Sequence, residues 1–455
     1  MSGLNNNIII VIRADSPAVA AAGFGVPCLV AAAGSLGVGF AERVRFYEQG
    51  SSAPADDLAA GDITASVKDA IDTAFSQKLH VSKVAVARID TDQAQVEKFT
   101  IGAGVAPNDV FSITIGVVTE QHVAGVVEDA AAVAAALRGQ LTTALAGTHT
   151  ISGSAADVIV TAAVAGEAFD VSSLYTATGG GTSSITESTT TPNLSIKTEL
   201  DAVVAAEPGF YAVVPETRVK LQLQRFAAWV EANARLGLVQ SSDSDVKTTA
   251  TTDVATALKQ LSYGRTAVVY HANNTEHCAF AWEAFKLEAD PDLRKTNWPY
   301  ATLAGITIGT FSATEKANIE GKNANLYWDF FKQGSTWRGT LANGRHIDEL
   351  ITDDWLTARM QERFAQLFLN TSNANRMLAL TDVGISAFVE ATLDVLNSGV
   401  KPGHFVPGSI SVSAPKASEL TASQKAAKTI PIEFVAQRAV GVDKATISGS
   451  VVIEL

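Results

Sequence analysis

The residues best suited to binding a metal ion are His271, Glu276, His277 and Cys278, which lie close together in the chain. His271 ends a predicted strand, and the other three precede a predicted helix. Zinc and iron sites usually take a second pair of ligands from another part of the sequence. No such pair is evident. We therefore predict capping and packing roles for these residues, with no metal and no other cofactor.

A glycine-rich segment, Gly34–Gly39, follows a predicted buried strand and is superficially similar to a dinucleotide-binding turn. Its glycine spacing differs from that of the nucleotide-binding pattern, and no acidic residue ends the next strand in the expected place. The sequence also lacks G-x-S-x-G, H-E-x-x-H, P-loop and C-x-x-C motifs. The sequence therefore predicts no catalytic or cofactor-binding residues and no enzymatic function.

Two acidic pairs, Asp348/Glu349 and Asp353/Asp354, open a predicted helix at 347–369. Carboxylates are favoured there because the helix dipole is positive at its N-terminus. Paired carboxylates for hydrolytic chemistry would need opposing partners in a cleft. A third possibility is a charged face that contacts another protein, and the sequence leaves these alternatives open.

The composition favours a globular protein of several domains that hides surface against partners. The chain has 455 residues, of which 47% are apolar and only 18% charged, and this length predicts two to four domains. The net charge is −13, and no basic run of the kind that binds nucleic acid is present. Cys28 and Cys278 lie in apolar surroundings, which indicates buried free thiols.

The run Ile8–Ile12 is too short to span a membrane and lacks the features of a signal peptide. We therefore expect a soluble protein that is cytoplasmic when made and binds neither membrane nor nucleic acid. Five β-branched residues in succession predict a strand with both faces covered, so this segment needs a host sheet. We assign residues 1–25 to an N-terminal arm.

A multi-domain α/β fold is predicted by buried strands that alternate with amphipathic helices. The core is expected to be discontinuous, formed by residues 26–95 and 196–318. Asp62 is a plausible cap for one of the helices. The predicted core strands are 26–32, 81–89, 210–215 and 266–271, and the helices are 62–77, 217–236 and 252–262.

Residues 96–195 differ from the core in composition and in hydrophobic pattern. They predict a small peripheral α+β module inserted into the core. Alternating segments around an Ala-rich helix at 130–146 indicate short strands, and Gly179–Thr191 predicts a flexible exit.

Residues 319–455 predict a C-terminal α+β domain. A hairpin around Gln333-Gly334 is followed by helices at 347–369 and 381–397. Further strands are expected at 409–414 and 429–437. The last predicted strand, 447–455, belongs to a C-terminal arm formed by residues 440–455.

The segment from Leu326 to Phe405 contains a Gly-Ser turn, G-x-x-I-D, D-W-L-x-x-x-x-Q and T-D-x-G, followed by a Gly/Pro-rich exit. With this set of motifs it resembles the C-terminal domain of a divergent family of bacteriophage contractile tail sheath proteins. Residues 107–172 also resemble a small domain that recurs in phage virion proteins, with D-x-F-x-I-T-I leading in and A-G-E-A-F-D-V leading out.

The resemblance implies a structural subunit that polymerises into stacked hexameric rings around a tail tube. Such a sheath contracts to drive the tube through the host envelope. Its partners would be copies of itself, the tube protein, and the baseplate and tail terminator proteins. The protein would belong to the virion tail and be assembled in the host cytoplasm. The alternatives are another structural protein of the tail or baseplate, or, less favoured, an α/β enzyme.

In this family the terminal arms add strands to sheets of neighbouring subunits, and the apolar ends of this chain suit that role. The expected intersubunit strand residues are Ile8, Ile9, Ile10, Val11, Ile12, Val451, Val452 and Ile453. The residues expected to face the tube are Asp348, Glu349, Asp353, Asp354 and Arg359.

Overall fold

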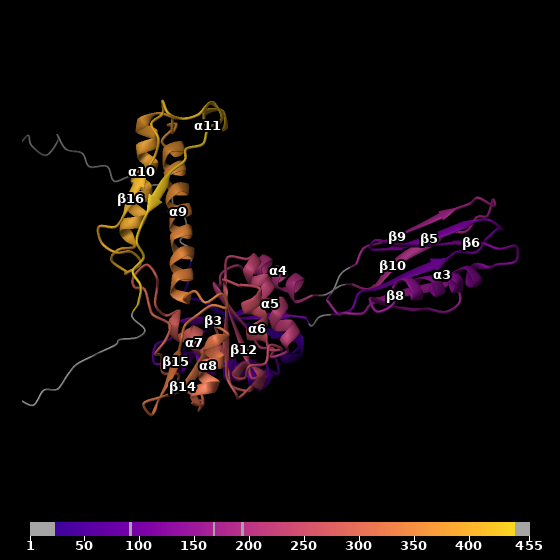
Figure 1. Ribbon diagram of the computed structural model, residues 1–455, viewed down its shortest axis with the longest axis horizontal. Coiled ribbons are helices and arrows are strands. Elements are labelled where there is room, and N and C mark those ends of the chain that lie inside the picture. The colour runs from indigo at the N-terminus through magenta and orange to yellow at the C-terminus, as the bar shows by residue number, and fades with distance from the viewer. Residues whose placement is uncertain (1–22, 91–92, 167–168, 193–194, 442–455) are drawn as a thin grey trace, which may run out of the picture.

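The centre of the molecule is an eight-stranded sheet with strand order β15-β14-β13-β12-β11-β1-β3-β2 (Figure 1). The computed structural model describes residues 23–90, 93–166, 169–192 and 195–441. Neighbouring strands are parallel from β3 to β14, and the edge strands β2 and β15 are antiparallel to their neighbours. The strands are β1 (Pro27–Ala32), β2 (Val44–Glu48), β3 (Lys83–Ile89), β11 (Ala212–Pro215), β12 (Leu236–Ser241), β13 (Thr266–Tyr270), β14 (Asn325–Phe330) and β15 (Gln333–Trp337).

Helices cover both faces of this sheet, which explains why its inner strands are apolar without alternation. Every residue of β11, β12 and β13 is buried, as expected for parallel strands between two helical layers. The mixed α/β fold predicted from the sequence is confirmed. One face carries α2 (Ala65–Phe75) and α7 (Cys278–Lys286), and the other carries α4 (Ile196–Ala206), α5 (Lys220–Ala232) and α6 (Val254–Gln260). The shorter elements are α1 (Ala53–Ala60), α8 (Ala313–Gly321) and the 3-10 turns η1 (Ala33–Ser35) and η2 (Ser244–Lys247).

Several local predictions are wrong. The predicted helix 217–236 is too long, because α5 ends at Ala232 and Leu236 begins β12. The N-cap of α2 is Thr64, whereas Asp62 lies 3.6 Å from Arg45 in an ion pair. The turn of the β14–β15 hairpin is Phe331-Lys332, with φ angles of 52° and 66°. Left-handed conformations at both central residues suit a tight hairpin turn but are unusual without glycine. Gln333 and Gly334 therefore lie inside β15.

The predicted domain boundary at residue 319 falls inside α8. Beyond it, β14 and β15 extend the central sheet next to β13. We therefore propose that the C-terminal domain begins after β15, where the chain leaves the sheet.

The insert has a hydrophobic core of its own, formed by residues between Phe99 and Val160. Its helix α3 (Ala130–Ala144) packs against strands of a four-stranded and a three-stranded sheet. The segment predicted as a flexible exit contains β10, which pairs with β4 at one sheet edge. The insert strands are β4 (Val96–Ile101), β5 (Val110–Ile115), β6 (Val118–Val123), β7 (His149–Ser152), β8 (Asp157–Ala162), β9 (Val171–Thr176) and β10 (Ile185–Thr191).

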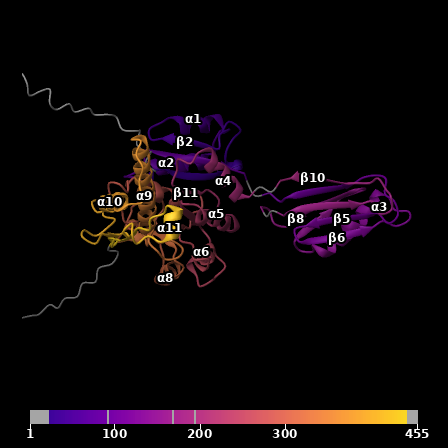
Figure 2. The same ribbon diagram turned by 90° about the horizontal axis from the view of Figure 1, so that it is seen from above.

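The C-terminal part is dominated by two long helices, α9 (Ile347–Asn373) and α10 (Asp382–Ser398), which pack side by side. Figures 1 and 2 show this pair standing on the core, with the insert joined to another side. A two-stranded sheet, β16 (Ser411–Ser413) with β17 (Glu433–Val435), and the short α11 (Ala422–Ala427) complete it. Among the described residues, no helix is long and apolar enough to cross a membrane.

The two ends of the insert join the core at neighbouring places. The backbone N–H of Asp90, after β3, donates to Glu199 of α4 at 3.2 Å, and Glu199 also pairs with Arg43. No described residue of the insert belongs to either cluster of the central core. The insert is therefore attached where two adjacent chain ends leave the body.

We predict that replacing residues 91–194 by a short Gly/Ser linker leaves the rest folded. Only surface contacts are lost, so the unfolding free energy of the remaining core should change by less than about 1 kcal/mol. Near-UV circular dichroism and thermal unfolding of the shortened chain measure this. An insoluble product, or one without a cooperative transition, would show that the insert shares the main core.

Candidate assembly surfaces

The residues considered for metal binding make ordinary structural contacts. His271 Nε2 lies 2.7 Å from Glu276, and the same carboxylate accepts hydrogen bonds from the N–H and O–H of Thr307. Burial lowers the pKa of His277 to about 4 and raises that of the Cys278 thiol. Within the described part of the chain, no group of three or more His, Cys, Asp or Glu side chains is placed to hold a metal ion.

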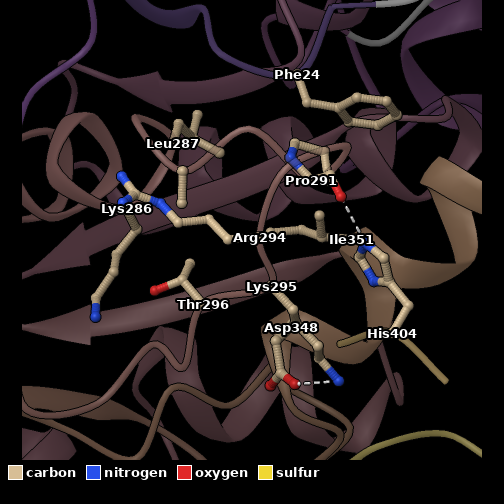
Figure 3. A pocket seen from close by; sticks show the side chains of 11 residues that line it. Phe24, Lys286, Leu287, Pro291, Arg294, Lys295, Thr296, Asp348, Ile351 and His404 are labelled. Carbon is tan, nitrogen blue, oxygen red and sulfur yellow. Dashed lines mark hydrogen bonds and ion pairs between the residues drawn. The ribbon is translucent and has the colours of Figure 1, made fainter. Parts of the chain in front are cut away.

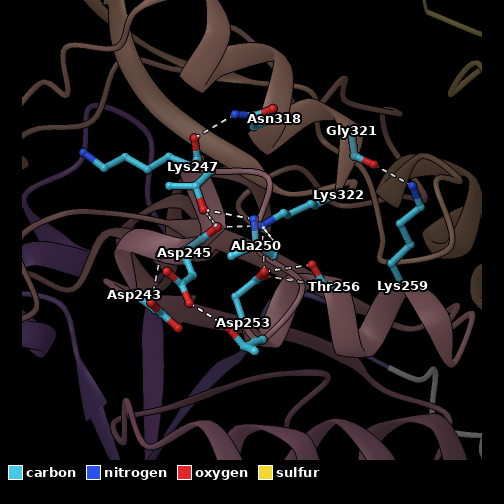
Figure 4. A network of polar contacts seen from close by, with 12 residues as sticks. Asp243, Asp245, Lys247, Ala250, Asp253, Thr256, Lys259, Asn318, Gly321 and Lys322 are labelled. Atoms are coloured by element: carbon cyan, nitrogen blue, oxygen red, sulfur yellow. Dashed lines mark hydrogen bonds and ion pairs between the residues drawn. The ribbon is translucent and has the colours of Figure 1, made fainter.

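The mostly buried ammonium group of Lys322 has an acceptor for each of its three N–H groups (Figure 4). It donates to the carbonyls of Asp245 and Ala250 at 2.6 and 2.7 Å and to the Asp253 carboxylate at 2.7 Å. Asp253 in turn caps α6 by accepting from the N–H of Thr256. This network ties the segment after α8 to the loop before α6 and leaves no open ligand position.

Glu283 is a buried carboxylate whose oxygens have no hydrogen-bond partner. It is fully buried on α7, and neither carboxylate oxygen has a hydrogen-bond partner. Burial raises its pKa well above the usual range. The titratable groups that its charge would affect are Cys28 on β1 and Tyr211 before β11. Since a buried carboxylate without a partner is costly, this side chain is held protonated.

The two-stranded sheet β16–β17 contains no buried residue. Among the described residues each strand pairs only with the other, and β16 packs beside α10. All three residues of β17 are exposed, with Phe434 at 44% and Val435 at 68%. A strand with an open edge and exposed apolar side chains is a template for pairing with another strand. The segment 429–437 was predicted as a strand, but the sequence does not show that its side chains would be uncovered.

The expected arm strands, Ile8–Ile12 and Val451–Ile453, lie outside the described residues, so their pairing stays a prediction. The described chain begins at Gly23 and ends at Gly441. The five residues expected to face the tube, in contrast, are all on the first half of α9, and the structure shows their contacts.

Asp348 and Asp354 are engaged in contacts with the core. Asp348 is 7% exposed and pairs with Lys295 at 2.9 Å. The Asp354 carboxylate accepts from the hydroxyl of Tyr211 at 2.6 Å and pairs with Arg265 at 2.5 Å.

Asp353 and Glu349 belong to an ionic cluster with two arginines. Asp353 pairs with Arg345 at 2.8 Å and with Arg438. Glu349 lies 3.5 Å from Arg345 and 4.0 Å from Arg438. Arg438 is 85 positions from Asp353 in the chain, and no sequence signal indicated this partnership.

Arg359 pairs with Asp292 at 2.7 Å and with Glu362 at 2.6 Å. The hydrogen bonds to Arg359 lower the pKa of the Asp292 carboxyl despite its partial burial. All five candidates therefore have partners within the chain. Contact with a tube stays a prediction for them, and Asp353 is the one in an ion pair whose two side chains both remain a third or more exposed.

Solved structures with a similar fold include chains of a contracted sheath and of a baseplate. The chain superposes on the helical sheath of the anti-feeding prophage in its contracted state with a TM-score of 0.53 and 10% identity, over 99% of each chain. A chain in the six-fold symmetrised baseplate of that particle gives a TM-score of 0.53 and 9% identity over 100% of each chain.

A third structure, the contracted PVC sheath complex of an extracellular contractile injection system, gives a TM-score of 0.52 and 9% identity. It covers 99% of this chain and 98% of that one. No family model and no curated protein matches the sequence. The chain thus shares the fold of these sheath and baseplate chains, with 98% or more of each chain covered.

The burial of Glu283 predicts a stability that depends on pH. The folded chain keeps the proton on Glu283 at pH values where the unfolded chain has lost it, so the unfolding free energy falls as pH rises above the ordinary glutamate pKa. Glu283→Gln cannot ionise. Its stability advantage over the parent should be small at pH 4 and should grow by up to about 1.4 kcal/mol per pH unit above that.

Urea unfolding of both proteins between pH 4 and 8 measures this difference. Glu390→Gln, on an exposed position of α10, is the matched control and should follow the parent at every pH. Parallel stability curves for Glu283→Gln and the parent would contradict the assignment.

Proposed function

We propose that this protein is the structural subunit of a contractile tail sheath, which polymerises with copies of itself around a tail tube. The observation that carries the proposal is the exposed β16–β17 sheet, which offers strand edges to other chains. The full-length likeness to a helical sheath supports it. The subunits would form stacked hexameric rings, and contraction would drive the tube through the host envelope.

The terminal arms would join the subunits by strand addition. An arm strand of the sequence Ile8–Ile12 or Val451–Ile453 would suit this sheet in a neighbour, since the arm is apolar and β-prone and β17 exposes Phe434 and Val435. Each backbone hydrogen bond formed is worth about 0.5–1.5 kcal/mol net. Covering Phe434 and Val435 adds apolar burial at about 25 cal/mol per Å². Contacts of this strength outlast the weaker polar contacts between subunit bodies.

The partners proposed for the sheath are the tail tube, the baseplate and the tail terminator, with assembly in the host cytoplasm and final location in the virion tail. The ion pairs at the start of α9 restrict which groups are open to the tube. Arg345, Asp353 and Arg438 each keep a third or more of the side chain exposed. We therefore place the proposed tube contact on this part of α9, where partly exposed charges would bind the tube only weakly and release it on contraction.

The strand-addition proposal predicts that Val435→Asp weakens assembly without unfolding the subunit. The side chain is exposed in the isolated chain, but the added strand would bury the new charge. A loss of about 1.4 kcal/mol per junction raises the protein concentration needed for assembly about tenfold. Deletion of residues 1–13 or 447–455, and the substitutions Ile9→Asp and Val452→Asp, should have the same effect.

Negative-stain microscopy and light scattering measure tube formation, and far-UV circular dichroism measures folding. Val38→Asp, at a fully exposed valine in the core loop after η1, is the control and should assemble as the parent does. Tubes formed by the truncated proteins would exclude strand addition as the joining mechanism. Small uniform oligomers of the parent protein would argue against a sheath altogether.

A further inference from the structure

The first and the last few described residues are both connected by side-chain contacts to the same helix, α9. We call residues 23–26 the N-terminal root and residues 438–441 the C-terminal root. Each root is held by residues of the first half of α9, together with the segment 286–297 of the core. The charged residues of α9 expected to face a tube are the ones that make these contacts.

The N-terminal root is fixed by Phe24, which is 7% exposed. Its ring packs edge-to-face on Tyr211 with a centroid distance of 4.8 Å. The hydroxyl of Tyr211 donates to Asp354 of α9 at 2.6 Å. On the other side, the guanidinium of Arg359 lies 5.9 Å from the centre of the Phe24 ring. Phe24 is therefore tied to α9 on two sides.

The C-terminal root is fixed by side-chain and backbone contacts. Arg438 pairs with Asp353 of α9. The N–H of Ala439 donates to the carbonyl of His404 at 3.0 Å, and its carbonyl accepts from Lys295 Nζ at 2.7 Å. Lys295 also pairs with Asp348 of α9, so this root too is connected to the helix by two routes.

Trp355 of α9 links the two roots. Its indole N–H donates to Asp292 at 2.6 Å, the carboxylate that also holds Arg359 beside Phe24. Its ring stacks on His404 with a centroid distance of 4.4 Å and an angle of 13°. Asp292 thus belongs to the N-terminal contacts and His404 to the C-terminal ones.

A small cavity lies between the two sets of contacts. Figure 3 shows Phe24 on one side of it and His404 with the Lys295–Asp348 pair on the other. Its volume is ≈ 20 Å³, about enough for one water molecule. Phe24 of the N-terminal root and the Lys295–Asp348 pair of the C-terminal contacts therefore line the same cavity.

From this arrangement we propose that the first half of α9 is a shared anchor for both terminal segments, with Phe24, Arg438 and Lys295 as positioning residues. The directions in which the two segments leave the body are then fixed relative to each other. The inference deepens the proposed sheath function, because a pull on either arm would pass into the same helix. Residues 23–26 and 438–441 would then move with the body of the subunit.

The test measures the distance between the roots in the dissolved, unassembled full chain. Spin labels are attached at Gly23→Cys and Val440→Cys, both exposed positions. The native Cys28 and Cys278 are buried, and burial raises the pKa of both thiols, so neither competes for the label. Double electron–electron resonance should give a narrow distance distribution.

Arg438→Ala and Phe24→Leu should each widen that distribution at least twofold. Leucine keeps an apolar group at position 24 but loses the ring contacts. Arg363→Ala is the matched control, since Arg363 is also on α9, pairs with Asp394 at 2.7 Å and is 39% exposed, as against 40% for Arg438. Its distribution should equal that of the parent.

Unchanged widths in both root variants, or equal widening in Arg363→Ala, would overturn the shared anchor. Because the measurement needs no assembly, it is separate from the test of the sheath function. If the parent forms tubes, Arg438→Ala should give tubes with weakened helical order, whereas Arg363→Ala tubes should keep theirs. Equal order in the two would likewise contradict the anchor.

Discussion

The packing of Trp355 fixes how the C-terminal helices stand on the core, and much of the remaining structure depends on it. The side chain is 1% exposed and lies in the same hydrophobic cluster as α2 and α7. Its single polar atom has a carboxylate partner in Asp292, so the large ring is buried without an unsatisfied donor. Ion pairs on both sides of α9 then set the rotation of the helix. Loss of this packing would disturb the C-terminal layer and both chain ends together.

The sequence predicted the parts of the fold whose signal is local. The strands in β11 and β13 were found because they are apolar throughout, which is typical of a sheet covered on two faces. The hairpin turn was misplaced because Phe331 and Lys332 take left-handed conformations that usually need glycine or asparagine. Strand β10 is not predicted because its threonines follow several glycines in a segment whose composition is typical of a loop. Threonine is nevertheless a good strand former.

The contacts at the start of α9 could not be predicted from the sequence, because they join distant parts of the chain. The carboxylates at the start of α9 were recognised as a group, but a helix dipole explains such a group without any partner. Arg438 and Tyr211 decide what those carboxylates do, and nothing near them in the sequence indicates the helix they contact. The exposed face of β17 is a matter of packing, since the same residues would look identical in a covered strand.

The way the insert is attached has a consequence for engineering. The chain leaves after Asp90 and returns at Ser195, the N-cap of α4, and Glu199 of that helix holds the Asp90 amide. A protein with closely spaced termini could be grafted at this junction without changing the spacing of the core elements. If the subunits do stack as a sheath, each grafted protein would be repeated at every subunit of the particle. The junction would then serve as a display platform with a fixed, periodic density.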